Sequence, residues 1–249
     1  MGRKAIGALE KMANILLGSI QKILAFLTVL EMNLLGLRWE VDAANLRPGK
    51  HPERSRAITL ILKMHREGEL LLPVNEAYQI YISVVRTEKV PGSLAEVGVF
   101  RGGSAKLICE AKGQRTLNLF DTFEGLPEVE GDDSHLFSQG EYRASFESVS
   151  KYLSRYPNVN IYKGYFPATS EPIKNDRFAF VHLDVDLHKS THDCLEFFYP
   201  RMNRGGIIIS HDYLYSPGVM KAFDDFFANK PETIIESPGL PGQALVVKM

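Results

Sequence analysis

Residues 94–104, Leu94-Ala95-Glu96-Val97-Gly98-Val99-Phe100-Arg101-Gly102-Gly103-Ser104, combine an apolar run, a glycine turn and the start of a helical pattern. A strand followed by such a turn places an adenosine-containing cofactor at the edge of an α/β sheet. Phe100 stands where a dinucleotide loop needs a glycine for the approach of a pyrophosphate, which disfavours NAD. Ser104 stands where a nucleoside triphosphate loop has lysine. The segment favours a nucleoside cofactor without phosphates, the alternative being an ordinary strand-to-helix turn.

The composition is that of a globular α/β protein. The chain has 249 residues, of which 45% are hydrophobic and 24% charged, enough for one large domain. A net charge of -1 without blocks of like charge argues against a nucleic-acid partner. Cys109 and Cys194 are too far apart for a zinc or redox motif, so we expect buried thiols in a reducing compartment. Glu10 and Lys11 interrupt any secretion signal, and the expected location is cytoplasmic.

Residues 1–50 form a predicted N-terminal helical extension. Apolar residues spaced four and three apart occupy one seam of this helix: Leu9, Ala13, Leu16, Ile20, Ile23, Leu27, Leu30 and Leu34. Such a seam needs a partner, and we expect packing in a homo-oligomer, with the chain's own domain and a membrane surface as alternatives. Gln21, Lys22 and Glu31 argue against a transmembrane span.

Residues 51–249 are predicted to form the second domain, in which apolar runs alternate with helical patterns. Two helical patterns, Arg54–Glu67 and Asn75–Glu88, precede the runs. The expected strands are Leu94–Val99, Thr116–Phe120, Val159–Tyr162, Phe178–Leu183, Ile207–Ser210, Thr233–Ile235 and Ala244–Val247. This alternation predicts an α/β fold with a mainly parallel seven-stranded sheet, an antiparallel edge hairpin and helices on both faces.

Residues 124–143, which we call the lid segment, lack periodicity and are rich in proline, glycine and acidic residues. Idle loops in compact domains are rarely longer than about 12 to 15 residues. We therefore expect a lid over an active site, with simple disorder as the alternative.

Polar side chains follow two of the expected central strands. Asp184 and Asp186 come directly after Phe178–Leu183, and His211 and Asp212 come directly after the next strand. Ligands bind at this carboxyl edge of parallel sheets, so Asp184, His211 and Asp212 are predicted to form a metal site. The carboxylates favour Mg²⁺, whereas the imidazole leaves Mn²⁺, Fe²⁺ and Zn²⁺ open. The alternative is that the acids cap the following helices.

Three further residues are candidates for separate roles. Asp121 ends the second expected strand, where an acid can bind the ribose hydroxyls of a nucleoside cofactor. His182 lies inside a strand and is expected to be a hydrogen-bonded core residue. His188 follows the acidic residues and is a candidate for proton transfer.

Four motifs together resemble the macrocin O-methyltransferase family over about residues 70–249. In order along the chain they are Glu96–Ser104, Phe120-Asp121-Thr122-Phe123-Glu124-Gly125-Leu126-Pro127, His182-Leu183-Asp184-Val185-Asp186-Leu187, and Gly205-Gly206 followed by His211-Asp212-Tyr213. The resemblance implies a Rossmann-like fold that uses S-adenosylmethionine and a divalent metal to methylate hydroxyls, often on sugars of natural products.

The resemblance also assigns site residues. It implies cofactor contacts from Glu96, Gly98, Val99, Arg101, Gly102, Ser104, Asp121, Thr122 and Phe123, and metal ligands Asp184, His211 and Asp212. The family usually has two aspartates at the last pair, so the histidine at position 211 is a departure that bears on the choice of metal.

The expected chemistry is methyl transfer to a hydroxyl of a small-molecule acceptor. The sulfonium methyl is already activated, so the enzyme must align it with the hydroxyl oxygen and remove the proton. We expect Mg²⁺ to lower the pKa of that hydroxyl and Asp186 to accept its proton, with His188 as the alternative base. The competing hypotheses are an NAD-dependent oxidoreductase and a non-catalytic scaffold that assembles through its N-terminal helix.

Overall fold

The computed structural model describes residues 52–129, 131–237, 239 and 241–249. The chain divides into two compact units, Met1–Pro52 and Glu53–Met249, and the second contains the fold described below. The predicted helical seam and its assembly role lie outside the described residues. Each helix of the described ranges is too short or too polar to cross a membrane.

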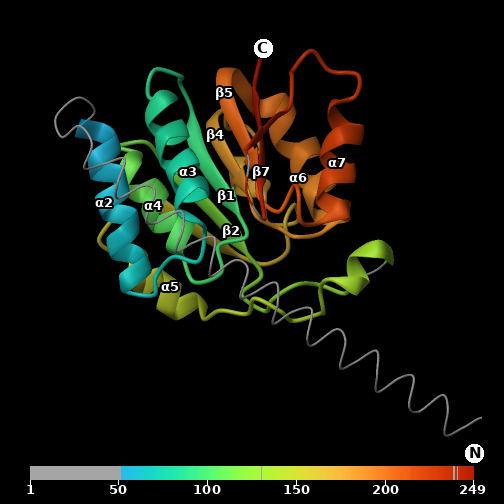
Figure 1. Cartoon of the computed structure of the whole chain (residues 1–249), viewed down its shortest axis with the longest axis horizontal. Helices are drawn as coiled ribbons and strands as arrows, with labels where there is room; N and C mark the ends of the chain where they lie inside the picture. Colours follow the sequence, from blue (N-terminus) through green and yellow to red (C-terminus); the bar gives the residue numbers. More distant parts are fainter. Residues whose placement is uncertain (1–51, 130, 238, 240) are drawn as a thin grey trace, which may run out of the picture. The chain divides into compact units, whose positions relative to one another are not determined.

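A seven-stranded sheet forms the centre of the second unit (Figure 1). Its strands are β1 (Ser93–Val97), β2 (Leu117–Asp121), β3 (Val159–Lys163), β4 (Phe178–Leu183), β5 (Met202–Ser210), β6 (Ile235–Ser237) and β7 (Gln243–Val247). The strand order is β3-β2-β1-β4-β5-β7-β6. The first five are parallel, and β7 runs antiparallel to both β5 and β6. The predicted Rossmann-like α/β fold with an antiparallel edge hairpin is confirmed.

Helices cover both faces of this sheet. They are α2 (Pro52–Arg66), α3 (Val74–Arg86), α4 (Gly103–Ala111), α5 (Phe146–Leu153), α6 (His188–Phe198) and α7 (Pro217–Phe227), with 3₁₀ turns η1 (Gly131–His135), η2 (Glu171–Ile173) and η3 (Tyr199–Arg201). Figure 1 shows α3 and α4 on one side of the sheet and α6 and α7 on the other. This arrangement of layers is usual where helices connect the parallel strands of one sheet.

Strand β4 explains where the site lies. All six of its residues are buried, because it pairs with β1 and β5 and is covered on both faces. Phe178, Val181 and Leu183 belong to the main apolar core together with Phe198 of α6 and Phe223 of α7. Burying each such side chain contributes about 1.5–3 kcal/mol. The chain therefore leaves β4 at a fixed point, where Asp184 begins the next loop.

Strands β1, β5 and β6 begin or end at other residues than predicted, because backbone conformation or strand pairing sets those ends. β1 stops at Val97 because Gly98 has a φ of +86° and the Val99 N–H bonds to a side chain instead of a strand. β5 begins at Met202, before the predicted Ile207, because Met202 pairs with Phe178 of β4. β6 is displaced to Ile235–Ser237, where it pairs with β7.

Candidate metal and cofactor site

The glycine loop after β1 lies directly against the end of β4. Gly98 and Gly102 have φ angles of +86° and +85°, which favour glycine. A Cβ atom on Gly98 would lie 1.7 Å from the backbone oxygen of Asp184. The Asp184 N–H also donates to the Val97 oxygen at 2.9 Å. The predicted cofactor loop and the predicted metal ligand are thus held together through their backbones.

Asp121 at the end of β2 holds the glycine loop in place. Its Oδ2 accepts hydrogen bonds from the N–H groups of Val99 and Phe100, both at 2.8 Å. Its Oδ1 accepts from the N–H of Phe123 at 2.6 Å. Thr122 bonds locally, its Oγ1 donating to the Gly125 oxygen at 2.8 Å. The structure thus gives Asp121 a loop-positioning role, and its contact with a ribose stays a prediction.

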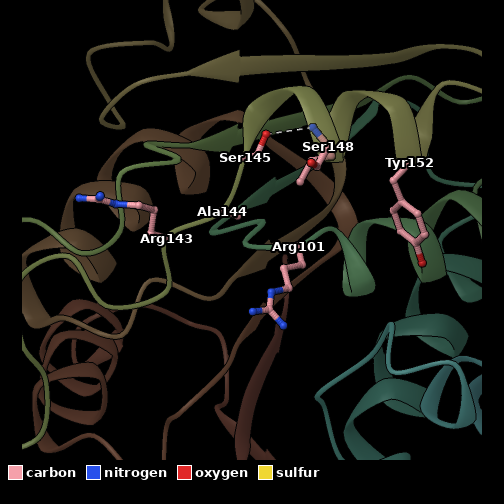
Figure 2. Close-up of a pocket in the computed structure, with 7 residues that line it drawn as sticks. Arg101, Arg143, Ala144, Ser145, Ser148 and Tyr152 are labelled. Carbon is pink, nitrogen blue, oxygen red and sulfur yellow. Dashed lines mark hydrogen bonds between the residues drawn. The ribbon is translucent and has the colours of Figure 1, made fainter.

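A cavity of about 470 Å³ lies beside this loop (Figure 2). Its lining comes from the glycine loop, from the residues just before α5 and from α5 itself: Arg101, Arg143, Ala144, Ser145, Ser148, Val149 and Tyr152. Ser145 caps α5, its Oγ accepting the N–H of Ser148 at 3.2 Å, as the dashed line in Figure 2 marks. Small-molecule sites have volumes of about 300–1,000 Å³, so the cavity is large enough for part of a cofactor or acceptor. Arg101 and Arg143 are the charged residues of this lining.

Glu96 lies away from this cavity, inside β1. It is fully buried, and its Oε1 is 2.8 Å from Nδ1 of His182 on β4. Burial raises the pKa of Glu96, although the partner His182 opposes the shift. The pair cross-links neighbouring central strands just below the glycine loop. His182 is therefore the hydrogen-bonded core residue that was predicted, and the direct contact of Glu96 with a cofactor stays a prediction.

Asp184, His211 and Asp212 converge as the sequence predicted. One ligand atom from each lies within 4.8 Å of the others. The His211 Nδ1 is 3.0 Å from Asp184 Oδ1 and 3.2 Å from Asp212 Oδ2. Neither contact has hydrogen-bond geometry, so this buried Nδ1 has no hydrogen-bond partner among the described residues. An unpartnered imidazole nitrogen facing two carboxylate oxygens fits a divalent cation.

The charges of neighbouring side chains outweigh burial in setting the pKa values of His211 and Asp184. Burial would lower the pKa of His211, but the charges of Asp212 and Asp184 raise it well above its usual value. Burial would raise the pKa of Asp184, but the charge of His211 lowers it. Without a cation, the imidazolium therefore supplies the positive charge that these carboxylates require.

Glu76 on α3 is a member of the site that the sequence analysis missed. Its Oε2 lies 2.9 Å from the His211 Nε2, and its Oε1 accepts the Gly242 N–H at 2.9 Å. The side chain is fully buried. The sequence feature that could have revealed Glu76 is its place among the apolar residues of α3, next to Val74 and Ala77. A charged side chain on a buried helix face needs a polar partner.

The two candidate bases lie in different surroundings. Asp186 is buried beside the cluster, and burial together with the carboxylates of Asp212 and Asp184 raises its pKa well above the usual value. The His188 ring stacks on His192 along α6, with a centroid distance of 6.4 Å. The assignment of Asp186 as the base, with His188 as the alternative, stays a prediction.

The lid segment contacts three neighbouring parts of the site. Tyr142 packs edge-on against Phe100 of the glycine loop, and Phe137 packs against Tyr215 in the loop after β5. Asp133 accepts the backbone N–H of His188 at 2.9 Å, at the start of α6. Partial burial, followed by the charges of Asp186 and Asp212, raises the pKa of the Tyr142 hydroxyl.

Comparisons with known proteins identify the family of the chain. The sequence model described as macrocin-O-methyltransferase matches residues 75–237. The chain is 36% identical over 152 residues to 8-demethyl-8-(2,3-dimethoxy-alpha-L-rhamnosyl)-tetracenomycin-C 4'-O-methyltransferase of Streptomyces olivaceus, a match that covers 54% of this chain and 58% of that protein. It is 32% identical over 156 residues to demethyldecarbamoylnovobiocin O-methyltransferase of Streptomyces niveus, covering 56% and 59%. The chain thus covers less than two thirds of these curated relatives.

Solved structures of two methyltransferases share the fold. The solved O-methyltransferase NovP has 25% sequence identity and a TM-score of 0.65, with 73% of this chain and 82% of that chain covered. The calicheamicin methyltransferase CalS11 has 21% identity and a TM-score of 0.60, with 86% and 91% covered. On the match over residues 75–237, the chain belongs to the macrocin O-methyltransferase family.

Proposed function

We propose that the protein transfers the methyl group of S-adenosylmethionine to a hydroxyl of a small molecule, with a divalent cation at Asp184, His211 and Asp212. The observation that carries this proposal is the joining of the two sites: the glycine loop touches the backbone of Asp184 at Gly98. A cofactor on that loop would lie beside the cation, as methyl transfer to a bound hydroxyl requires.

Each element has a distinct task in this reaction. The glycine loop and Asp121 hold the nucleoside end of the cofactor, and the basic cavity beside Arg101 offers charge for an anionic group. A bound cation such as Mg²⁺ would fix the acceptor oxygen and lower its pKa. Asp186 accepts the released proton from a buried position next to that oxygen. The lid segment excludes water through Phe137 and Tyr142 and contributes to the acceptor pocket.

The proposed acceptor is a sugar hydroxyl of a glycosylated natural product. The name of the Streptomyces olivaceus relative contains a rhamnosyl group and specifies 4'-O-methylation, and a Micromonospora griseorubida relative, 32% identical over 142 residues, is named mycinamicin III 3''-O-methyltransferase. The rhamnosyl group in the first name is a sugar, which supports a glycosylated acceptor. An acceptor panel for this chain should therefore begin with deoxysugar glycosides and include free phenols as a contrasting class.

Calorimetric titration with S-adenosylmethionine and NAD tests the cofactor assignment first. We expect binding of S-adenosylmethionine and none of NAD, and the opposite result would favour an oxidoreductase. Turnover is then measured across the acceptor panel with and without a chelator. Binding of S-adenosylmethionine without turnover on any acceptor would favour a non-catalytic scaffold.

Substitutions test the assigned roles. Asp212→Asn should abolish metal-dependent turnover, since it removes a ligand, whereas Glu128→Gln at an exposed position of the lid segment should not. Asp186→Asn should lower kcat about 10²–10⁴-fold with metal binding intact, the usual range for loss of a general base. Near-normal turnover by this variant would overturn the assignment of the base.

A further inference from the structure

Glu76 is a buried carboxylate for which the proposed reaction gives no role. Its two oxygens face two different nitrogens, the backbone N–H of Gly242 and Nε2 of His211, each at 2.9 Å. The amide can only donate, so Oε1 is an acceptor. An ionised carboxylate can only accept hydrogen bonds. The hydrogen bond at Oε2 therefore requires that Nε2 of His211 carries a hydrogen and donates it.

That proton decides which nitrogen of His211 is free. In a neutral imidazole one nitrogen carries the hydrogen and the other a lone pair. With Nε2–H donating to Glu76, the lone pair lies on Nδ1, the atom that is 3.0 Å from Asp184 Oδ1 and 3.2 Å from Asp212 Oδ2. Two carboxylate oxygens repel such a lone pair, so Nδ1 carries a proton in the metal-free protein and is available to a cation that replaces this proton. Nδ1 is buried and has no hydrogen-bond partner in the described part of the chain.

We propose that Glu76 is a positioning residue that makes His211 a metal ligand through Nδ1, and that the resulting site binds Mn²⁺ more tightly than Mg²⁺. The inference deepens the proposed function, because it concerns the same metal site. A carboxylate behind a histidine fixes the ring orientation and makes the other nitrogen a better ligand. Imidazole suits first-row transition ions, whereas Mg²⁺ prefers oxygen ligands only.

Glu76→Gln is the informative substitution because it keeps the shape and changes one acceptor into a donor. If the new amide donates to His211, Nε2 has to accept and the ring proton moves to Nδ1, where it blocks the metal. If the amide turns the other way, it faces the N–H of Gly242, donor against donor. The first orientation removes Nδ1 as a ligand, and the second removes the Gly242 hydrogen bond that holds the side chain against His211, so the variant should weaken metal binding.

The experiment measures Mn²⁺ binding to the full chain by electron paramagnetic resonance, without cofactor or acceptor, and Mg²⁺ binding by competition. For the unsubstituted protein we expect tighter binding of Mn²⁺ than of Mg²⁺. Glu76→Gln should weaken Mn²⁺ binding about 10–100-fold, the usual effect of losing such a partner. Equal affinities for the two ions would overturn the metal preference, and unchanged Mn²⁺ binding by the variant would overturn the role of Glu76.

A second background separates positioning from structural damage. In His211→Asp the imidazole is absent, so Glu76→Gln should cause no further loss of Mn²⁺ affinity, and the preference for Mn²⁺ should shrink. The same loss in both backgrounds would show that Glu76 acts only through the fold and would refute the proposal. Binding of S-adenosylmethionine, titrated separately, reports on the proposed function independently of these results.

The tautomer can also be observed without substituting Glu76. In protein labelled with ¹⁵N-histidine and loaded with diamagnetic Zn²⁺, the His211 ring should carry its proton on Nε2. The His211→Asp variant identifies this signal among those of the chain's 7 histidines. A proton on Nδ1 in the loaded protein would overturn the proposal even if Glu76→Gln failed to fold.

Discussion

Gly98→Ala should both destabilise the protein and disturb its metal site. A non-glycine residue at a φ of +86° costs about 1–2 kcal/mol. The added Cβ would lie 1.7 Å from the backbone oxygen of Asp184 and 2.7 Å from its carbonyl carbon, so that carbonyl would have to retreat by well over an ångström. Forcing extra volume into a packed site adds about 1–3 kcal/mol. The expected loss of unfolding free energy is therefore about 2–5 kcal/mol.

Gly113→Ala is the matched control. Gly113 also has a positive φ, +61°, but a Cβ there meets nothing within 4 Å, so only the backbone cost of about 1–2 kcal/mol applies. Urea unfolding of both variants, with equal slopes, gives the difference. Because Asp184 has to move in the first variant only, Mn²⁺ binding should weaken in Gly98→Ala and persist in Gly113→Ala. Equal stability losses in the two variants would refute the steric argument.

Three further outcomes can be measured on the metal-free protein. Asp186→Asn should raise the thermal midpoint in the presence of a chelator, because burial and nearby carboxylates raise the pKa of Asp186. A carboxyl whose pKa is raised in the folded state destabilises the folded protein once the pH rises above the ordinary pKa of 3.8. The rise in thermal midpoint caused by Asp186→Asn should therefore be larger at pH 8 than at pH 4. A lower midpoint of the variant at pH 8 would contradict this. Asp133→Ala removes the acceptor for the first N–H of α6. It should lower the free energy of unfolding by about 1 kcal/mol and speed proteolysis of the lid segment. Glu128→Ala, at an exposed position of the same segment, should change neither the stability nor the rate of proteolysis. Equal cleavage of the two variants would contradict the view that Asp133 holds the lid segment against α6. Ellman's reagent should react with Cys109 and Cys194 only in urea, since burial raises the pKa of Cys109 to about 12 and that of Cys194 well above its usual value; rapid reaction of the folded protein would contradict their burial.

The central strands could be predicted because they are apolar on both faces. Phe178–Leu183 has the predicted bounds as β4, since every residue in it is buried. The edge could not be predicted as well, because the residues of Ile235–Ser237 are mostly exposed and only their pairing with β7 defines β6. Buried strands can therefore be recognised in the sequence by their apolar residues, whereas the residues at which a strand begins and ends depend on its hydrogen bonds.

The candidate site was predictable to the extent that it follows from strand order. Asp184 and the His211–Asp212 pair meet because β4 and β5 are parallel neighbours that end at the same edge. The contact between Glu76 and His211 joins positions 135 apart in the sequence and depends on how α3 packs. Nor does a strand pattern show that Glu96 pairs with a histidine on the neighbouring strand. Contacts across elements need the packed structure.

The lid segment is attached to the rest of the site by side chains that lie on separate neighbours. Asp133 meets the start of α6, Phe137 meets Tyr215, and Tyr142 meets Phe100. If the lid segment covers the acceptor as proposed, a directed-evolution library that keeps these three contacts and randomises the positions between them should change acceptor preference without disturbing the metal cluster. Exchange of the segment between relatives would test the same proposal.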